Sequence, residues 1–150
     1  MSTIDTPNII NSTLQVGTST TAGYLLTADT SGNATWQAAP AGGLSWAAAT
    51  GDATMTVGHG YLANKGTLLT LTLPTTSAVG TSVRVAGMNA GLWKIAQAAG
   101  QYIKFGNQNT TTGTGGYLAS VLTYDAVELI CIVADTGWTV VSSLGNITIV

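Results

Sequence analysis

The chain has 150 residues, of which 45% are apolar and only 7% are charged, and its formal net charge is −2. This length and apolar content suffice for a domain with a buried core, so we exclude a disordered chain. With only four Lys and Arg residues, the chain lacks the basic surface that nucleic-acid binding requires and the charged flanks of a coiled coil. It also lacks a run of about 18 apolar residues, so we expect no membrane insertion.

The first 43 residues are rich in Thr, Ser, Asn and Gly and contain few large apolar side chains. Residues 1–43 are expected to form a shaft or attachment segment, because they cannot build a core alone and need support from further copies of the chain. Within this segment, Tyr24 to Thr27 and Ala34 to Gln37 are predicted to pair as a hairpin around the polar turn Asp29 to Asn33. The start of the chain has no Lys or Arg and no apolar core, so we expect no signal peptide.

Strand signals become dense after Pro40 to Gly43 and continue to Val150. Leu69 to Leu73 and Ser82 to Val85 alternate apolar and polar side chains with a period of two, which is typical of strands with one buried face. No segment shows a convincing helical pattern. We therefore expect an all-β protein with a β-sandwich, jelly-roll-like head over residues 44–150; one continuous β-domain is the alternative.

The strand Val127 to Val133 is apolar on both faces. Val127, Leu129, Cys131 and Val133 share one face, and Ile130 and Ile132 lie on the other. A strand of this kind needs cover on both sides, so we expect the core on one side and a partner chain on the other. The lone cysteine in this strand is predicted to be a buried structural thiol, because it has no second Cys to pair with.

Groups that could carry catalysis or hold a metal are few: six carboxylates and His59. The nearest carboxylate pair is Asp125 and Glu128, and a spacing of three residues along a strand points the two side chains to opposite faces. We expect Asp125 to be a solvated turn residue and Glu128 a strand-end residue bonded to the backbone or a lysine. His59 is expected in an exposed turn, unless three copies of the chain bring their His59 side chains together around one axis to bind an ion. No catalytic residue, cofactor or metal site is predicted.

The Gly-rich stretch Gly106 to Gly116 is predicted to be a long surface loop. It has no lysine in the position that grips a phosphate, which excludes a nucleotide loop. Its amides and hydroxyls can bond to sugar hydroxyls, and an aromatic ring such as Tyr102, Tyr117 or Trp93 could stack on a sugar. The alternative is a polar loop that binds nothing, with Tyr102, Trp93 and Trp138 in the core. The candidate receptor- or glycan-binding residues are Asn107, Gln108, Asn109, Thr110, Thr111, Thr112 and Tyr117.

Two parts of the chain resemble known fibre proteins. In Val16 to Gln37, an Ala-Gly pair, a short apolar strand, a Ser-Gly turn and a Thr-Trp pair follow one another. This stretch resembles the connector that recurs in bacteriophage tail fibres and related surface fibres. Six further motifs are Gly60 to Asn64, Leu71 to Pro74, Gly91 to Gln97, Gly100 to Gly106, Thr110 to Gly116 and Trp138 to Asn146. In this order they resemble the head domain of such fibres, which implies an all-β, homotrimeric, receptor-binding or adhesive knob.

Three classes of function follow as hypotheses. The first is a non-enzymatic, trimeric fibre protein of a phage or virus-like particle that recognises a host-surface receptor, either a glycan or a protein, with a neutral glycan as the expected ligand. Its N-terminal segment would attach to tail or capsid proteins, and the protein would reside on the virion and be extracellular after release. The second is a capsid-decorating or purely structural fibre protein. The third, a depolymerase, is disfavoured by the scarcity of carboxylates.

Overall fold

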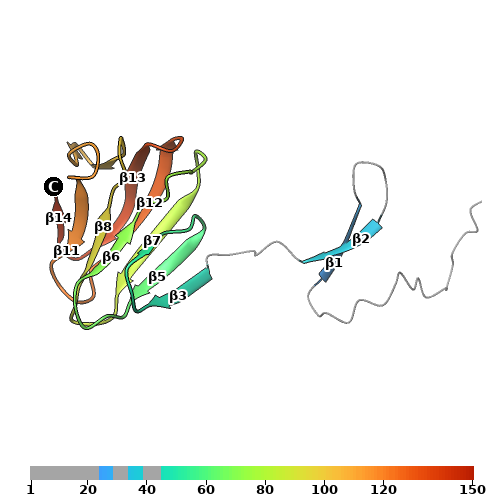
Figure 1. The fold of residues 1–150 in the computed structure, drawn as a ribbon, viewed down its shortest axis with the longest axis horizontal. Helices are drawn as coiled ribbons and strands as arrows, with labels where there is room; N and C mark the ends of the chain where they lie inside the picture. Colours follow the sequence, from blue (N-terminus) through green and yellow to red (C-terminus); the bar gives the residue numbers. More distant parts are fainter. Residues whose placement is uncertain (1–23, 29–33, 39–44) are drawn as a thin grey trace, which may run out of the picture. The chain divides into compact units, whose positions relative to one another are not determined.

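The computed structural model of this protein describes residues 24–28, 34–38 and 45–150. Within these ranges all regular secondary structure is β, which confirms the expected all-β class (Figure 1). None of the described segments is a helix long and apolar enough to cross a membrane. The chain divides into two units, Met1–Gly42 and Gly43–Val150.

The described part of the first unit is a two-stranded hairpin. Strand β1 (Tyr24–Ala28) pairs antiparallel with β2 (Ala34–Ala38), with Tyr24 opposite Ala38 and Ala28 opposite Ala34. The pairing confirms the hairpin predicted from the sequence. The predicted turn Asp29 to Asn33 lies outside the described residues, as do the other parts of the expected shaft segment 1–43.

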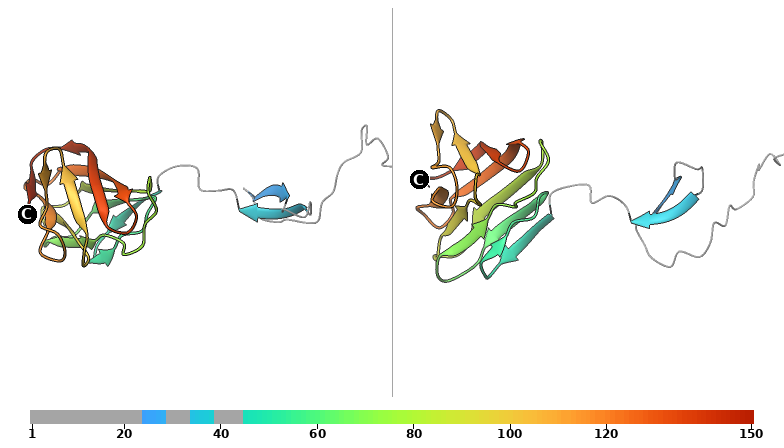
Figure 2. Two further views of the ribbon diagram at one scale, coloured as in Figure 1. Left: turned by 90° about the horizontal axis from the view of Figure 1, so that it is seen from above. Right: turned by 45° about the horizontal axis from the view of Figure 1, so that its top comes forward.

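The second unit packs two mixed sheets face to face (Figure 2). The first sheet has seven described strands in the order β10-β9-β13-β12-β7-β5-β3, and the second has five in the order β14-β11-β8-β6-β4. The strands of the first sheet are β3 (Ser45–Ala49), β5 (His59–Ala63), β7 (Ser82–Gly87), β9 (Tyr102–Phe105), β10 (Gln108–Asn109), β12 (Ala126–Val133) and β13 (Gly137–Leu144). Those of the second are β4 (Ala53–Thr54), β6 (Leu69–Thr72), β8 (Trp93–Ala96), β11 (Tyr117–Ser120) and β14 (Ile147–Ile149). The sandwich expected from the sequence is therefore present.

The first half of this sandwich winds like a coil. From β3 to β8 the chain alternates between the two sheets, so β3, β5 and β7 run parallel in one sheet and β4, β6 and β8 run parallel in the other. Five of the ten described strand pairs in this unit are parallel, whereas a jelly roll is built from antiparallel strands. The architecture is a two-sheet sandwich with a coiled first half.

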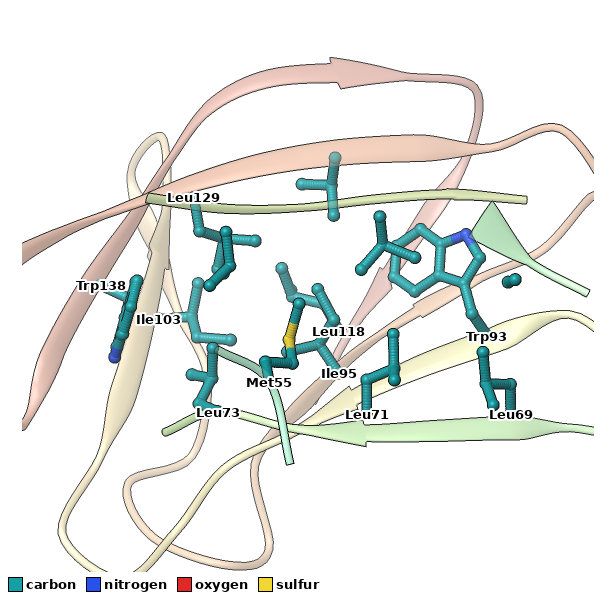
Figure 3. Packing of buried hydrophobic residues seen from close by; sticks show 14 of the residues in the cluster. Met55, Leu69, Leu71, Leu73, Trp93, Ile95, Ile103, Leu118, Leu129 and Trp138 are labelled. Carbon is teal, nitrogen blue, oxygen red and sulfur yellow. The ribbon is translucent and has the colours of Figure 1, made fainter. Parts of the chain in front are cut away.

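The core lies between the two sheets. Leu69, Leu71 and Leu73 have no exposed surface and point into the sandwich, as Figure 3 shows. Thr70 and Thr72, which alternate with them, are half-buried, and this confirms the predicted period of two. The other large side chains labelled in Figure 3 are also buried between the sheets: Met55, Trp93, Ile95, Ile103, Leu118, Leu129 and Trp138.

Strand β12 has one face on the core and one face on the outside. Val127, Leu129 and Cys131 are buried, as predicted, and Cys131 is a free thiol. The prediction is wrong for Val133, which is 46% exposed, because a register shift between Cys131 and Val133 turns the end of the strand. On the outer face Ile130 is half-buried and Ile132 is exposed, so no element of the described chain covers this side fully.

Candidate ligand-binding pocket

A tight hairpin places polar side chains at one edge of the seven-stranded sheet. Strands β9 and β10 pair antiparallel and are joined by the two-residue turn Gly106-Asn107. Gly106 has a φ of +60°, as the first position of a type II′ turn requires, and glycine adopts this φ without strain. Lys104 lies opposite Asn109 in the ladder, and both side chains are exposed. Paired residues project to the same side of a sheet, so these two side chains are neighbours.

A pocket of about 280 Å³ opens beside this hairpin. Its lining residues are Tyr102, Lys104, Asn109 and Thr112. Tyr102 precedes Lys104 by two residues on β9, which puts both on one face. The hydroxyl end of the Tyr102 ring packs against Gly137. A Cβ at that glycine would lie 2.7 Å from the Tyr102 hydroxyl oxygen. The pocket therefore joins an aromatic surface, an ammonium group, an amide and a hydroxyl.

Two buried glutamines fix the loop that supplies this pocket. The Gln97 Nε2 donates to the carbonyls of Gln101 at 2.6 Å, Thr111 at 3.0 Å and Gly113 at 3.2 Å. The Gln97 Oε1 accepts a hydrogen bond from the Thr110 hydroxyl. The bonds to Thr110, Thr111 and Gly113 tie the segment after β10 to the end of β8, so they hold the backbone around Thr112 in place.

Gln101 anchors the same region from the other side. Its Nε2 donates to the carbonyls of Pro74 at 2.7 Å and Asp135 at 2.9 Å, and its Oε1 accepts from the Ala98 amide at 2.8 Å. The side chain is 1% exposed, and all of its hydrogen bonds are made to backbone groups. Neither Gln97 nor Gln101 was identified from the sequence. The available signal in the sequence was that these two glutamines lie on either side of Gly100 in a mostly apolar segment.

The structure brings together only part of the predicted site. Asn109 and Thr112 line the pocket, with Tyr102 as the ring. Thr110 is 4% exposed, and its hydroxyl, which bonds to Gln97, also accepts from the Ile103 amide at 2.8 Å, so it acts as a structural residue.

The remaining predicted residues lie away from the pocket. Asn107, Gln108 and Thr111 are exposed but do not line it. Tyr117 belongs to β11 of the other sheet, where the Lys94 ammonium lies 5.4 Å from its ring centre. Trp93 is fully buried, as in the alternative considered for the aromatic residues.

Asp125 is a buried structural group. It is 3% exposed, and its Oδ2 accepts hydrogen bonds from the amides of Val121 and Leu122, both at 2.8 Å. The expectation of a solvated turn carboxylate is wrong, because the segment before β12 folds back over the Asp125 side chain and Gly145 packs against it. Burial raises the pKa of this carboxyl, but the backbone amide donors outweigh burial and hold the pKa below its ordinary value.

Glu128 pairs with an arginine on the outer face of the seven-stranded sheet. Its Oε1 lies 2.5 Å from an Arg84 guanidinium nitrogen, and the two residues are opposite each other on β12 and β7. The expected bond to the backbone or a lysine is therefore wrong. A pocket of about 170 Å³ surrounds this pair and includes Trp46 and Leu144 in its lining. Its ion pair and apolar rim suit contact with a protein better than acid–base chemistry.

The lone histidine and cysteine have structural contacts. His59 begins β5, is half-buried and has its Nδ1 3.1 Å from the Val57 carbonyl oxygen, so the expected exposed turn is wrong in detail. The Cys131 thiol lies 3.3 Å from the Val133 carbonyl oxygen and is buried, as predicted. Within the described residues, no group of three or more His, Cys, Asp or Glu side chains is placed to hold a metal ion.

No family model matches the chain, and no curated protein matches it.

Proposed function

We propose that this protein is the non-enzymatic, receptor-binding head of a homotrimeric fibre on a phage or virus-like particle, and that it recognises a host-surface glycan. The observation that carries the proposal is the pocket formed by Tyr102, Lys104, Asn109 and Thr112. The resemblance of Val16 to Gln37 and of the later motifs to fibre connectors and heads supports the same assignment. On this proposal the protein resides on the virion and residues 1–43 attach it to tail or capsid proteins.

The chemistry of the pocket suits a sugar ring. The face of Tyr102 offers an apolar surface for the C–H groups of a sugar, and Asn109 and Thr112 offer donors and acceptors for its hydroxyls. Because Gln97 and Gln101 already hold the surrounding backbone, binding costs little ordering of the loop. Such preorganisation increases affinity without any additional contact.

The outer face of the seven-stranded sheet supports self-association. Ile132 is 38% exposed and Leu144 is 67% exposed. The Arg84 Nε is buried and makes no hydrogen bond within the described residues. Apolar groups and an unsatisfied donor on one sheet face are suited to burial against a second copy, which could supply an acceptor. We assign the subunit contact of the homotrimer to this face.

The carboxylates favour a binding protein over a depolymerase. Asp125 is engaged by backbone amides and Glu128 by Arg84, and a glycosidase needs two carboxyl groups on either side of a sugar bond. The second candidate is a capsid-decorating or purely structural fibre protein. The exposed apolar face would serve such a protein equally, whereas the pocket would have no role in it.

The test is adsorption and glycan binding by matched variants of the assembled protein. Asn109→Ala removes an amide that lines the pocket, and we expect glycan-array binding and competition for host-cell adsorption to fall about tenfold. The control is Gln108→Ala, since the neighbouring exposed amide on the same strand lies outside the pocket. Equal glycan binding and equal competition for adsorption by the two variants would favour the structural candidate. So would a parent protein that binds neither host cells nor glycans.

A further inference from the structure

The basic side chains of the head differ in what balances their charge. Lys65 lies 2.8 Å from Asp52, and Arg84 pairs with Glu128. Lys94 lies over the ring of Tyr117. Within residues 45–150, Lys104 alone of the basic side chains has neither a carboxylate nor an aromatic ring against its ammonium group. A free ammonium group in a pocket can bind a ligand anion without first breaking an internal ion pair.

The surroundings of Lys104 also favour an anion. None of the residues that line its pocket is acidic, and the polar neighbours Asn109 and Thr112 carry N–H and O–H donors. Residues 45–150 contain equal numbers of basic and acidic side chains, so the head as a whole does not repel a negative ligand. Three donor side chains around one opening match a group with several acceptor oxygens.

We infer that the pocket takes a glycan with an anionic substituent, a carboxylate or a phosphate, whose charge is bound by Lys104 while the sugar ring lies against Tyr102. This inference rests on the proposed function and changes the expected ligand from a neutral to an acidic glycan. Sugar acids and phosphorylated glycans share this chemistry, and the experiment must separate them.

The experiment measures binding of the full, assembled chain to an array that carries neutral, uronate- or sialate-bearing and phosphate-bearing glycans, at low and at raised salt. The expected result is binding of one acidic class at least tenfold more tightly than its neutral counterpart, with weaker binding as salt rises. Lys104→Gln should reduce binding of that class to the level of the neutral glycan, a loss of about tenfold. Lys94→Gln is the control, since it removes the same charge from the outer face of the other sheet.

The outcomes separate this inference from the function on which it rests. Equal binding of neutral and acidic glycans, with no effect of Lys104→Gln, would overturn the anionic ligand and leave glycan recognition standing. An equal loss in Lys94→Gln would also overturn it, because attraction would then depend on total charge. Absence of binding to any glycan would overturn the proposed function itself.

Discussion

Substitution of Gln97 by methionine tests whether its buried amide holds the segment after β10, around Thr112, in place. Methionine keeps the length and volume of the side chain and removes its polar head. The Gln101 carbonyl keeps the Gly113 amide as a donor at 2.7 Å, and the Gly113 carbonyl keeps the Gly116 amide at 3.1 Å. The Thr111 carbonyl loses the Gln97 amide as its donor, and the Thr110 hydroxyl loses Gln97 as its acceptor and keeps only the longer contact to the Ile103 carbonyl at 3.4 Å.

The expected cost follows from these two groups. A buried donor or acceptor that loses its partner costs about 1–3 kcal/mol. Part of the Thr111 residue is exposed, so water can reach its carbonyl and reduce that cost. We therefore expect Gln97→Met to lower the free energy of unfolding of the head by about 3 kcal/mol, which for a domain of this size lowers Tm by roughly 10–15 °C.

The assay combines chemical denaturation at fixed protein concentration with hydrogen exchange at the Gly113 amide, which bonds across the loop to Gln101. Exchange at this amide should accelerate, and glycan affinity should fall as Thr112 loses its fixed position. Gln108→Met is the matched control, because its side chain is exposed, and it should stay within about 0.5 kcal/mol of the parent. A loss of less than about 1 kcal/mol in Gln97→Met would refute the role of the buried amide.

Three further predictions address the carboxylates and the subunit contact. Asp125→Asn should destabilise the head by about 2 kcal/mol, because its amide offers a weaker acceptor to the backbone N–H groups of Val121 and Leu122. Since the folded pKa of Asp125 is depressed, its stabilisation is complete above the unfolded pKa and is lost as pH falls through the lower folded pKa. The measurement is Tm against pH for the parent protein and for Asp125→Asn. An equal fall in Tm for both as the pH is lowered would contradict this pH dependence. Glu128→Gln should leave glycan binding within a factor of a few, and loss of a hydrolytic activity would overturn the non-enzymatic proposal. Ile132→Asp should break the proposed trimer by placing an unpaired charge in an apolar contact, and light scattering that still gives a trimer would exclude this face.

Local patterns predicted the strands and their buried faces well. The alternation at Leu69 to Leu73 arises from the geometry of an extended chain, and it held in the sandwich. The hairpin of β1 and β2 was equally visible, since its turn residues and strands are adjacent in sequence. Features of this kind depend on neighbours within a few residues.

The remainder depended on contacts between distant residues. Nothing in the segment around Asp125 indicates that Gly145 packs against its carboxylate, so a turn residue and a buried anchor have the same local pattern. The pairing of Glu128 with Arg84 follows from strand order, which puts β7 beside β12. The parallel coil from β3 to β8 could not be predicted either, because side chains alternate with a period of two in parallel and in antiparallel strands alike.

The most direct measurement is a crystal structure of the assembled protein with the glycan that binds most tightly on the array. We predict a sugar ring against Tyr102, its hydroxyls bonded to Asn109 and Thr112, and an anionic group beside Lys104. Glycan bound instead on the outer face, between Trp46 and Leu144, or on the sheet that carries Tyr117, would contradict the assignment of this pocket as the receptor site.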